Sequence, residues 1–226
     1  MKKSAVFSFS LLISIFLLSS AQATWYAISD LPGGQLVVGD KTFSNFDVPA
    51  PIVQGGPPKP TADTIEVEGI QIGDEYGLHF RIAMCAASDQ LINPNINFKI
   101  TTSDPWVIES AKLWVPGAGA TGDGLVTISE NIFDAQYFGN QLTDELNCSI
   151  EDGSTIILRE ETLDWVGSPL DEVWVYTGII VRGGFDPGIG TANATDVYML
   201  YTQVPEPTTI LLLGLGVLAL VRKRRQ

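Results

Sequence analysis

Hydrophobic and polar residues alternate along most of the chain, as in strands that bury one face. In residues 78–84 the even positions are apolar, and the odd positions include His79 and Arg81. The same period of two recurs at residues 64–72, 96–100, 126–128, 156–158, 173–179 and 197–201. Turn-forming clusters separate these stretches at residues 93–95, 117–124, 151–153 and 183–190. The sequence therefore predicts an all-β domain built as an antiparallel β-sandwich.

Three regions depart from this pattern. Residues 106–115 are apolar in both phases, which predicts a central strand. Residues 54–60 contain three prolines, and proline cannot donate a ladder hydrogen bond, so we expect a loop or a polyproline-like spacer. Residues 131–145 have some helical character.

The first residues have the pattern of an export signal. Two lysines follow the initial Met, residues 5–18 are apolar, and Ala21 and Ala23 form a small-x-small cleavage site. This predicts a signal peptide at residues 1–23 and a mature chain that begins at Thr24. A membrane anchor is the alternative, but the apolar run is short and contains serines.

The last residues fall into three parts. The two prolines of the Pro205-Glu206-Pro207 run disfavour helix at the residues before them, so a helix can begin only at or after Pro207. Residues 208–221 carry no charge and are apolar on every side. We expect a single C-terminal hydrophobic helix there, about 21 Å long against a bilayer core of about 30 Å, which makes it a marginal span. The basic end at residues 222–226 should stay cytoplasmic and help by snorkelling, through Arg222, Lys223, Arg224 and Arg225. A buried helix of a soluble fold and a tail anchor that is never cut are the alternatives.

This tripartite tail, residues 204–226, resembles the PEP-CTERM sorting signal. The resemblance implies handling by an exosortase-type processing enzyme at the inner membrane, and delivery to the extracellular polysaccharide matrix of a Gram-negative bacterium. Residues 31–46, with a Gly39-Asp40-Lys41 turn followed by Phe43 and Phe46, are similar to the opening hairpin of many PEP-CTERM ectodomains. We interpret both phenylalanines as core residues. The family has no assigned catalytic residues, so none is transferred.

Removal of both ends leaves residues 24–203 as one secreted domain. Residues 24–204 hold 25 of the 26 acidic and seven of the 13 basic residues, a net charge of −18. Such a domain repels nucleic acid and anionic lipid, and nucleic-acid binding is excluded.

Cys85 and Cys148 are the two cysteines of the chain. Because both would reach an oxidising compartment, we expect one disulfide that closes a long loop, with two free buried thiols as the alternative.

Little in the sequence indicates catalysis. His79 is the single histidine of the sequence, and no Gly-x-Ser-x-Gly motif is present. His79 lies in the polar phase of its predicted strand, which predicts a solvated side chain. One histidine and two cysteines exclude a strong zinc site. A glycosidase needs two facing carboxylates, but the sequence cannot pair candidates such as Glu109, Glu130, Glu160 and Glu161. We therefore expect no enzyme and no cofactor.

Calcium is the other use of acidic loops, because it takes oxygen ligands outside cells. The candidates do not follow an Asp-x-Asp-x-Asp-Gly pattern, and surface solvation is the simpler interpretation of Asp123, Asp144, Glu145, Glu151, Asp152 and Asp186.

Five tryptophans could stack on a sugar: Trp25, Trp106, Trp114, Trp165 and Trp174. Burial is the simpler interpretation of each, and Trp165, beside Asp164 and Gly167, is the best candidate for an exposed ligand-binding ring. The sequence thus favours an exported, non-enzymatic surface or matrix protein with a structural or adhesive role. A carbohydrate- or calcium-dependent binding module is the alternative, followed by a secreted hydrolase.

Overall fold

The computed structural model describes residues 24–103, 106–136, 139–151, 154–162, 171–184 and 189–205. The predicted signal peptide, the predicted C-terminal helix and Trp165 lie outside these residues. No helix in the described ranges is long and apolar enough to cross a membrane.

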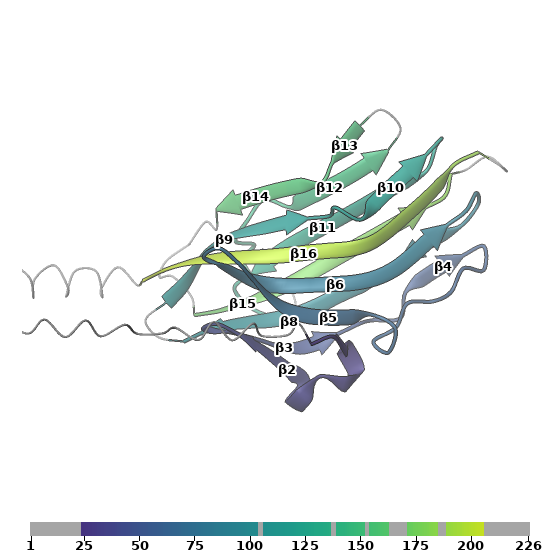
Figure 1. Cartoon of the computed structure of the whole chain (residues 1–226). Coiled ribbons are helices and arrows are strands. Elements are labelled where there is room, and N and C mark those ends of the chain that lie inside the picture. The colour runs from purple at the N-terminus through teal and green to yellow at the C-terminus, as the bar shows by residue number, and fades with distance from the viewer. Residues whose placement is uncertain are drawn as a thin grey trace, which may run out of the picture.

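Two antiparallel sheets face each other, which confirms the predicted β-sandwich (Figure 1). The first sheet has the order β1-β5-β6-β16-β9-β14, and β10 pairs with β16. Its strands are β1 (Tyr26–Ala27), β5 (Glu66–Ile72), β6 (Glu75–Ala86), β16 (Thr191–Pro205), β9 (Trp106–Trp114), β14 (Leu158–Thr162) and β10 (Ala118–Thr121). Two short 3₁₀ turns, η1 (Ile28–Asp30) and η2 (Pro32–Gly34), connect β1 to the second sheet.

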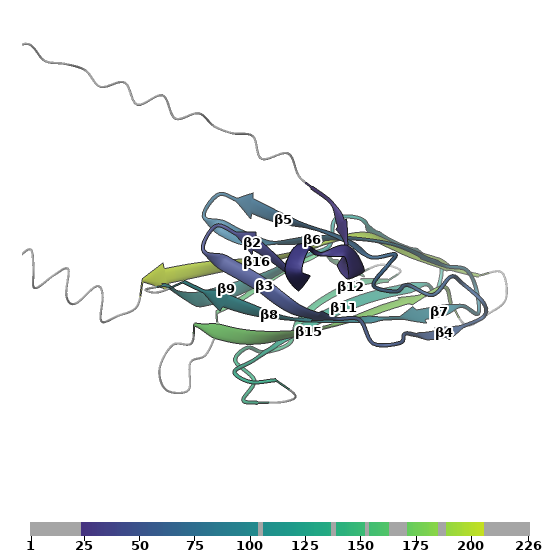
Figure 2. The same ribbon diagram turned by 90° about the horizontal axis from the view of Figure 1, so that it is seen from below.

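The second sheet has the order β13-β12-β11-β15-β8-β3-β2, and β7 pairs with both β15 and β4. Its strands are β13 (Ser154–Ile156), β12 (Leu146–Glu151), β11 (Leu125–Phe133), β15 (Glu172–Arg182), β8 (Asn95–Thr102), β3 (Lys41–Asp47), β2 (Gln35–Val38), β7 (Leu91–Asn93) and β4 (Ile52–Gln54). Figure 2 shows β5, β6 and β16 in one layer and β8, β11 and β15 in the other.

The core lies between the sheets and follows the predicted alternation. Phe98 on β8 contacts the rings of Phe43, Phe46 and Phe80, with centroids 6.2, 5.6 and 6.1 Å away. Phe80 belongs to β6, so this aromatic cluster joins the two sheets. Phe43 is fully buried and Phe46 packs against the core, as predicted. Truncation of a buried phenylalanine such as Phe98 costs about 3–5 kcal/mol.

Three regional predictions can be compared with the structure. Strand β9 lies between β16 and β14, as predicted for residues 106–115. Strand β4 ends at Gln54, and residues 55–60 form a loop, as predicted for most of residues 54–60, with Pro57 and Pro60 buried. The helical prediction for 131–145 is wrong, because β11 continues through Phe133 along β15 and β12 begins at Leu146. Ile132 pairs with Val175 of β15 and is buried, so pairing between distant strands overrides the local helical character.

The predicted disulfide is absent, since Cys85 and Cys148 are free thiols. Cys85 lies on the solvent phase of β6, in the first sheet, and is exposed. Cys148 lies on β12 of the second sheet and faces the core, where its thiol contacts the carbonyl of Leu113 at 3.5 Å. Cys85 faces solvent on the outer side of the first sheet, whereas Cys148 lies in the core on its inner side. A disulfide between them would need a large backbone movement.

Among the described residues, the ionisable side chains of Lys41 and Glu130 are fully buried. The Lys41 ammonium contacts Asp40 at 3.4 Å, Gln203 and the ring of Tyr76, and burial lowers the pKa of this lysine. Glu130 accepts a hydrogen bond from Tyr201, and burial raises the pKa of Glu130 to about 8. Glu130 is on β11 and Tyr201 on β16, so this bond crosses the core from one sheet to the other.

Candidate functional site

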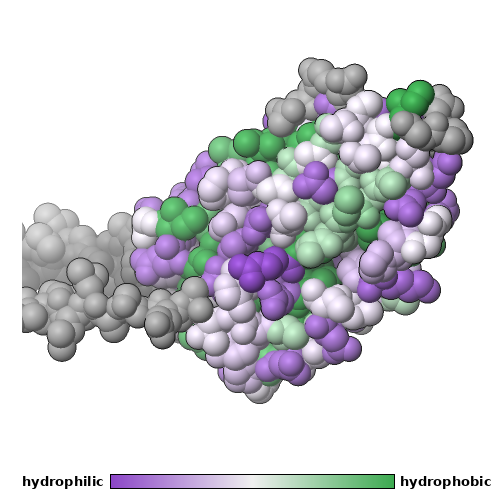
Figure 3. Space-filling view, turned by 45° about the vertical axis from the view of Figure 1, so that its right-hand side comes forward, coloured by the Kyte–Doolittle hydropathy of each residue, from purple (hydrophilic) through white to green (hydrophobic). Residues whose placement is uncertain are grey.

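One row of side chains crosses the outer face of the first sheet. Strand register places Glu68 opposite His79, His79 opposite Tyr198, and Tyr198 opposite Trp114. Directly opposite residues have Cβ atoms about 4.5–5.5 Å apart, so the row follows from the register alone. It runs across β5, β6, β16 and β9. Hydrophilic and hydrophobic residues are interspersed over this side of the molecule (Figure 3).

The rings of the row are in contact. His79 stacks on Tyr198 with centroids 3.9 Å apart and planes 14° apart, and Trp114 contacts Tyr198 at 4.7 Å. Trp25, at the start of the described chain, meets the His79 ring edge-on at 4.8 Å. The Arg81 guanidinium lies 4.0 Å from the centre of the Trp25 ring, a cation–π contact.

His79 holds this arrangement together. Its Nδ1 lies 2.9 Å from Glu68 Oε1, and its Nε2 lies 2.9 Å from Asp196 Oδ1. Both nitrogens are therefore engaged by carboxylates, and the ring donates to both when it is protonated. The predicted solvated side chain is wrong, since His79 is only 7% exposed. Trp25 packs against His79 on the outer face of β6, a contact that the alternation pattern alone could not show.

The neighbouring groups have shifted pKa values. A hydrogen bond from the Thr195 hydroxyl, followed by those from His79, lowers the pKa of Asp196 despite partial burial. Burial raises the pKa of Tyr198, and the Asp196 and Glu68 carboxylates add to this effect. At neutral pH, Asp196 is therefore an anionic acceptor and Tyr198 keeps its phenolic proton.

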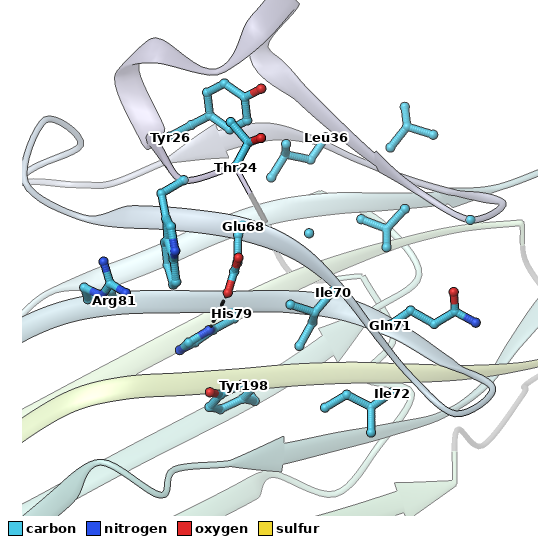
Figure 4. A pocket seen from close by; sticks show the side chains of 15 residues that line it. Thr24, Tyr26, Leu36, Glu68, Ile70, Gln71, Ile72, His79, Arg81 and Tyr198 are labelled. Carbon is cyan, nitrogen blue, oxygen red and sulfur yellow. Dashed lines mark hydrogen bonds and ion pairs between the residues drawn. The ribbon is translucent and has the colours of Figure 1, made fainter. Parts of the chain in front are cut away.

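A groove of about 870 Å³ opens beside the row (Figure 4). We call it the aromatic groove. Strand β1 pairs with β5 only at Glu66 and Val67, and further along β5 the side chain of Val38 on β2 lies against Gly69. The polar side of the groove is formed by Glu68, His79, Arg81 and Tyr198, and the apolar side by Trp25, Tyr26, Leu36, Val37, Val38, Ile70 and Ile72.

Glu68 is the one carboxylate among the described residues that line this groove. Figure 4 shows it pointing toward His79 from the groove wall. Its Oε1 contacts His79, but its buried Oε2 has no hydrogen-bond partner among the described residues. A buried carboxylate oxygen without a partner is costly. This oxygen is closed off from solvent, so a ligand hydroxyl would reach it only after a neighbouring side chain had moved.

The carboxylates considered for catalysis do not converge. Glu130 is fully buried in the core, Glu109 is exposed on β9, and Glu160 on β14 lies 3.4 Å from Lys112. Of the calcium candidates, Asp144, Glu145 and Glu151 are exposed, and Asp152 and Asp186 lie outside the described residues. No group of three or more metal-ligating side chains occurs in the described part of the chain.

The predicted burial of the tryptophans holds for Trp174 but not for Trp25 and Trp114. Trp25 and Trp114 are half-buried on the outer face of the first sheet, whereas Trp174 is buried on the second. The signal for Trp114 was present in the sequence, because it shares its strand phase with the charged Lys112. No such signal exists for Trp25, whose ring contacts His79 and Arg81 on β6.

Comparison with known proteins bears mainly on the tail. The PEP-CTERM protein-sorting motif matches residues 203–225. No curated protein matches the chain significantly. Among solved structures, TmCBM61 in complex with β-1,4-galactotriose is similar at 10% identity and a TM-score of 0.32, over 72% of this chain and 90% of that chain. The enzymatically active domain of bacteriophage CBA120 tailspike protein 4 is similar at 15% identity and a TM-score of 0.29, over 70% of this chain and 19% of that one.

At these TM-scores neither structure informs the function of this chain. The matched motif confirms the interpretation of the tail, and such a motif implies export, anchoring at the C-terminal end and processing by an exosortase-type system. The chain is therefore an exported protein that carries a PEP-CTERM sorting motif.

Proposed function

We propose that this protein is a non-enzymatic component of the cell surface or extracellular matrix, with an adhesive role, and that it binds neutral polysaccharide through the aromatic groove. The observation that carries the proposal is the set of contacting rings of Trp25, His79, Tyr198 and Trp114 beside an open groove. Aromatic rings pack against the apolar faces of sugars, and a few convergent polar groups fix their orientation.

Charge supports a neutral ligand. The full chain carries a net charge of −13, and a surface of this sign repels polyanions. In the groove wall, the Glu68 carboxylate would repel the carboxylate or sulfate groups of an anionic polymer. Arg81 is already held by Trp25 and by Glu66, at 3.1 Å, and provides no free cationic site.

The course of β16 constrains the proposed processing. The strand runs to Pro205 and pairs there with Trp106, so the sorting motif begins inside the last strand of the sandwich. Cleavage at or beyond Pro205 would release the domain with β16 intact. At the other end, cleavage after Ala23 would leave Trp25 as the second residue, at the rim of the groove.

The proposal is tested by retention of the extracellular form on immobilised neutral matrix polysaccharide from the producing organism. We expect Trp25→Ala to reduce retention strongly, and Val37→Asp, which adds a charge on an exposed groove position, to do the same without loss of core packing. Ile52→Ala, exposed on β4 of the other sheet, is the matched control. Equal retention of all four proteins would contradict the proposal, and release of reducing ends from the polymer would favour a hydrolase instead.

A further inference from the structure

A second groove, of about 470 Å³, lies on the outer face of the second sheet. We call it the polar groove. One row across it pairs Asp47 with Asn97, Asn97 with Tyr176, and Tyr176 with Asn131. A second row, two residues along, pairs Asn95 with Gly178 and Gly178 with Ser129. The groove therefore spans four adjacent strands: β3, β8, β15 and β11.

The polar groups in this groove are available to a ligand. The side chains of Asn95, Asn97 and Ser129 form no hydrogen bond within the described protein, although all three line the groove. Asn131 accepts one bond from Gln141, at 3.0 Å, which leaves its amide NH₂ free to donate. Each amide supplies both donors and an acceptor, so the row offers several neutral hydrogen-bonding atoms on one surface.

Gly178 opens the floor of the polar groove. A Cβ atom at this position would lie 3.3 Å from Ser129 Oγ and 3.6 Å from Asn95 Oδ1. Those two polar atoms therefore flank the same point above the backbone, where no side chain stands. Beside it, Tyr176 packs edge-on against Phe133, at 5.4 Å and 83°, which fixes the orientation of its half-buried ring.

This combination fits a neutral sugar. Amide and hydroxyl groups match the donors and acceptors of vicinal sugar hydroxyls, and a fixed aromatic ring supplies a packing surface. The volume lies within the range of about 300–1,000 Å³ that is usual for small-molecule sites. Asp47 is the one charged side chain among the described residues of the lining, which does not favour an anion.

We propose that the polar groove is a second saccharide-binding site, independent of the aromatic groove. The two sites lie on the outer faces of opposite sheets, so ligands bound to them would lie on opposite sides of the sandwich. If the proposed function of the aromatic groove holds, one domain then joins two polymer chains. This bivalence would give an adhesive protein more avidity than either site alone.

The test is a titration of the extracellular form with two neutral β-linked trisaccharides, one of glucose and one of galactose, followed by the backbone amide NMR signals of Asn95, Asn97 and Gly178. We expect shifts at these three amides with at least one trisaccharide. Asn97→Ala should weaken this binding about fivefold, the loss of one hydrogen bond, and Gly178→Val, which fills the floor, should abolish it.

Asn193→Ala, an exposed asparagine on the first sheet, is the matched control and should leave the shifts unchanged. Trp25→Ala should also leave them unchanged, which separates this site from the aromatic groove. The absence of shifts with both trisaccharides would overturn the proposal, and so would shifts that persist in folded Gly178→Val protein. Thermal unfolding of each variant shows that it is folded.

Discussion

The hydroxyl of Tyr201 donates a hydrogen bond to Glu130 at 2.8 Å across the core of the sandwich. The two residues belong to different sheets, and both side chains are fully buried. Burial holds the pKa of Glu130 at about 8, far above the ordinary value of a carboxyl group. At neutral pH the core therefore contains a protonated glutamic acid rather than a carboxylate.

This carboxyl group should make stability depend on pH. Its pKa is about 8 in the folded protein and near 4.5 when unfolded, so between these values only the folded state binds the proton. Its contribution is present below pH 4.5 and is lost as pH rises to 8, at up to about 1.4 kcal/mol per pH unit. Glu130→Gln, which keeps the shape and stays neutral, should remove this slope in urea unfolding at pH 5, 6.5 and 8. Parallel slopes for both proteins would refute a buried, titrating Glu130.

Removal of the partner should also be costly. Tyr201→Phe leaves the bonded oxygen of Glu130 buried without a donor, a loss of about 1–3 kcal/mol of unfolding free energy. Tyr198→Phe removes a half-exposed hydroxyl on the outer face and is the matched control, with an expected change near zero. Urea unfolding at pH 6 compares the two variants. Equal effects would show that the bond across the core contributes nothing specific.

His79 should be required for the order of the aromatic groove. His79→Ala would remove the ring between Trp25 and Tyr198 and leave the buried Glu68 carboxylate without its partner. We expect a loss of about 1–3 kcal/mol, the cost of leaving a buried polar group without its hydrogen-bond partner, and a red shift of tryptophan fluorescence in the folded state. Arg81→Ala, which removes an exposed ion pair, should cost less than about 1 kcal/mol. An unchanged emission spectrum in His79→Ala would show that His79 does not hold Trp25.

The fold could be predicted because it depends on the alternation of apolar residues, which is local. Leu78, Phe80 and Ile82 occupy the core as their phase predicts. The site could not be predicted, because it depends on register between strands far apart in sequence. Nothing near His79 in the chain reveals that Glu68 and Asp196 meet its two nitrogens, or that Tyr198 lies under its ring.

Burial of ionisable side chains was the hardest property to predict. Lys41 and Glu130 share the core-facing phase of their strands with apolar residues and lie inside the protein. The cysteines illustrate the same difficulty, since two residues in an exported chain suggest a bond that their opposite orientations prevent. Trp165 lies outside the described residues, so its role as a ligand-binding ring stays a prediction.

The two thiols should differ in reactivity. Cys85 is exposed, whereas burial raises the pKa of Cys148 to about 12 and keeps it protonated at neutral pH. In the absence of reductant, iodoacetamide at pH 8 should therefore modify one thiol of the folded protein and two thiols of the protein unfolded in urea. The mass after labelling reports the number. Absence of labelling in urea would reveal a Cys85–Cys148 disulfide and contradict the structure.

The central claim is that the protein is trimmed at both ends and released to the cell exterior as an intact sandwich. Intact mass, measured without reductant on the membrane and extracellular fractions, tests it most directly. We predict an extracellular species that begins at Thr24, ends at or just beyond Pro205 and retains both thiol hydrogens. A single membrane-bound species with the whole tail through Gln226 would contradict the claim and make this an ordinary anchored protein.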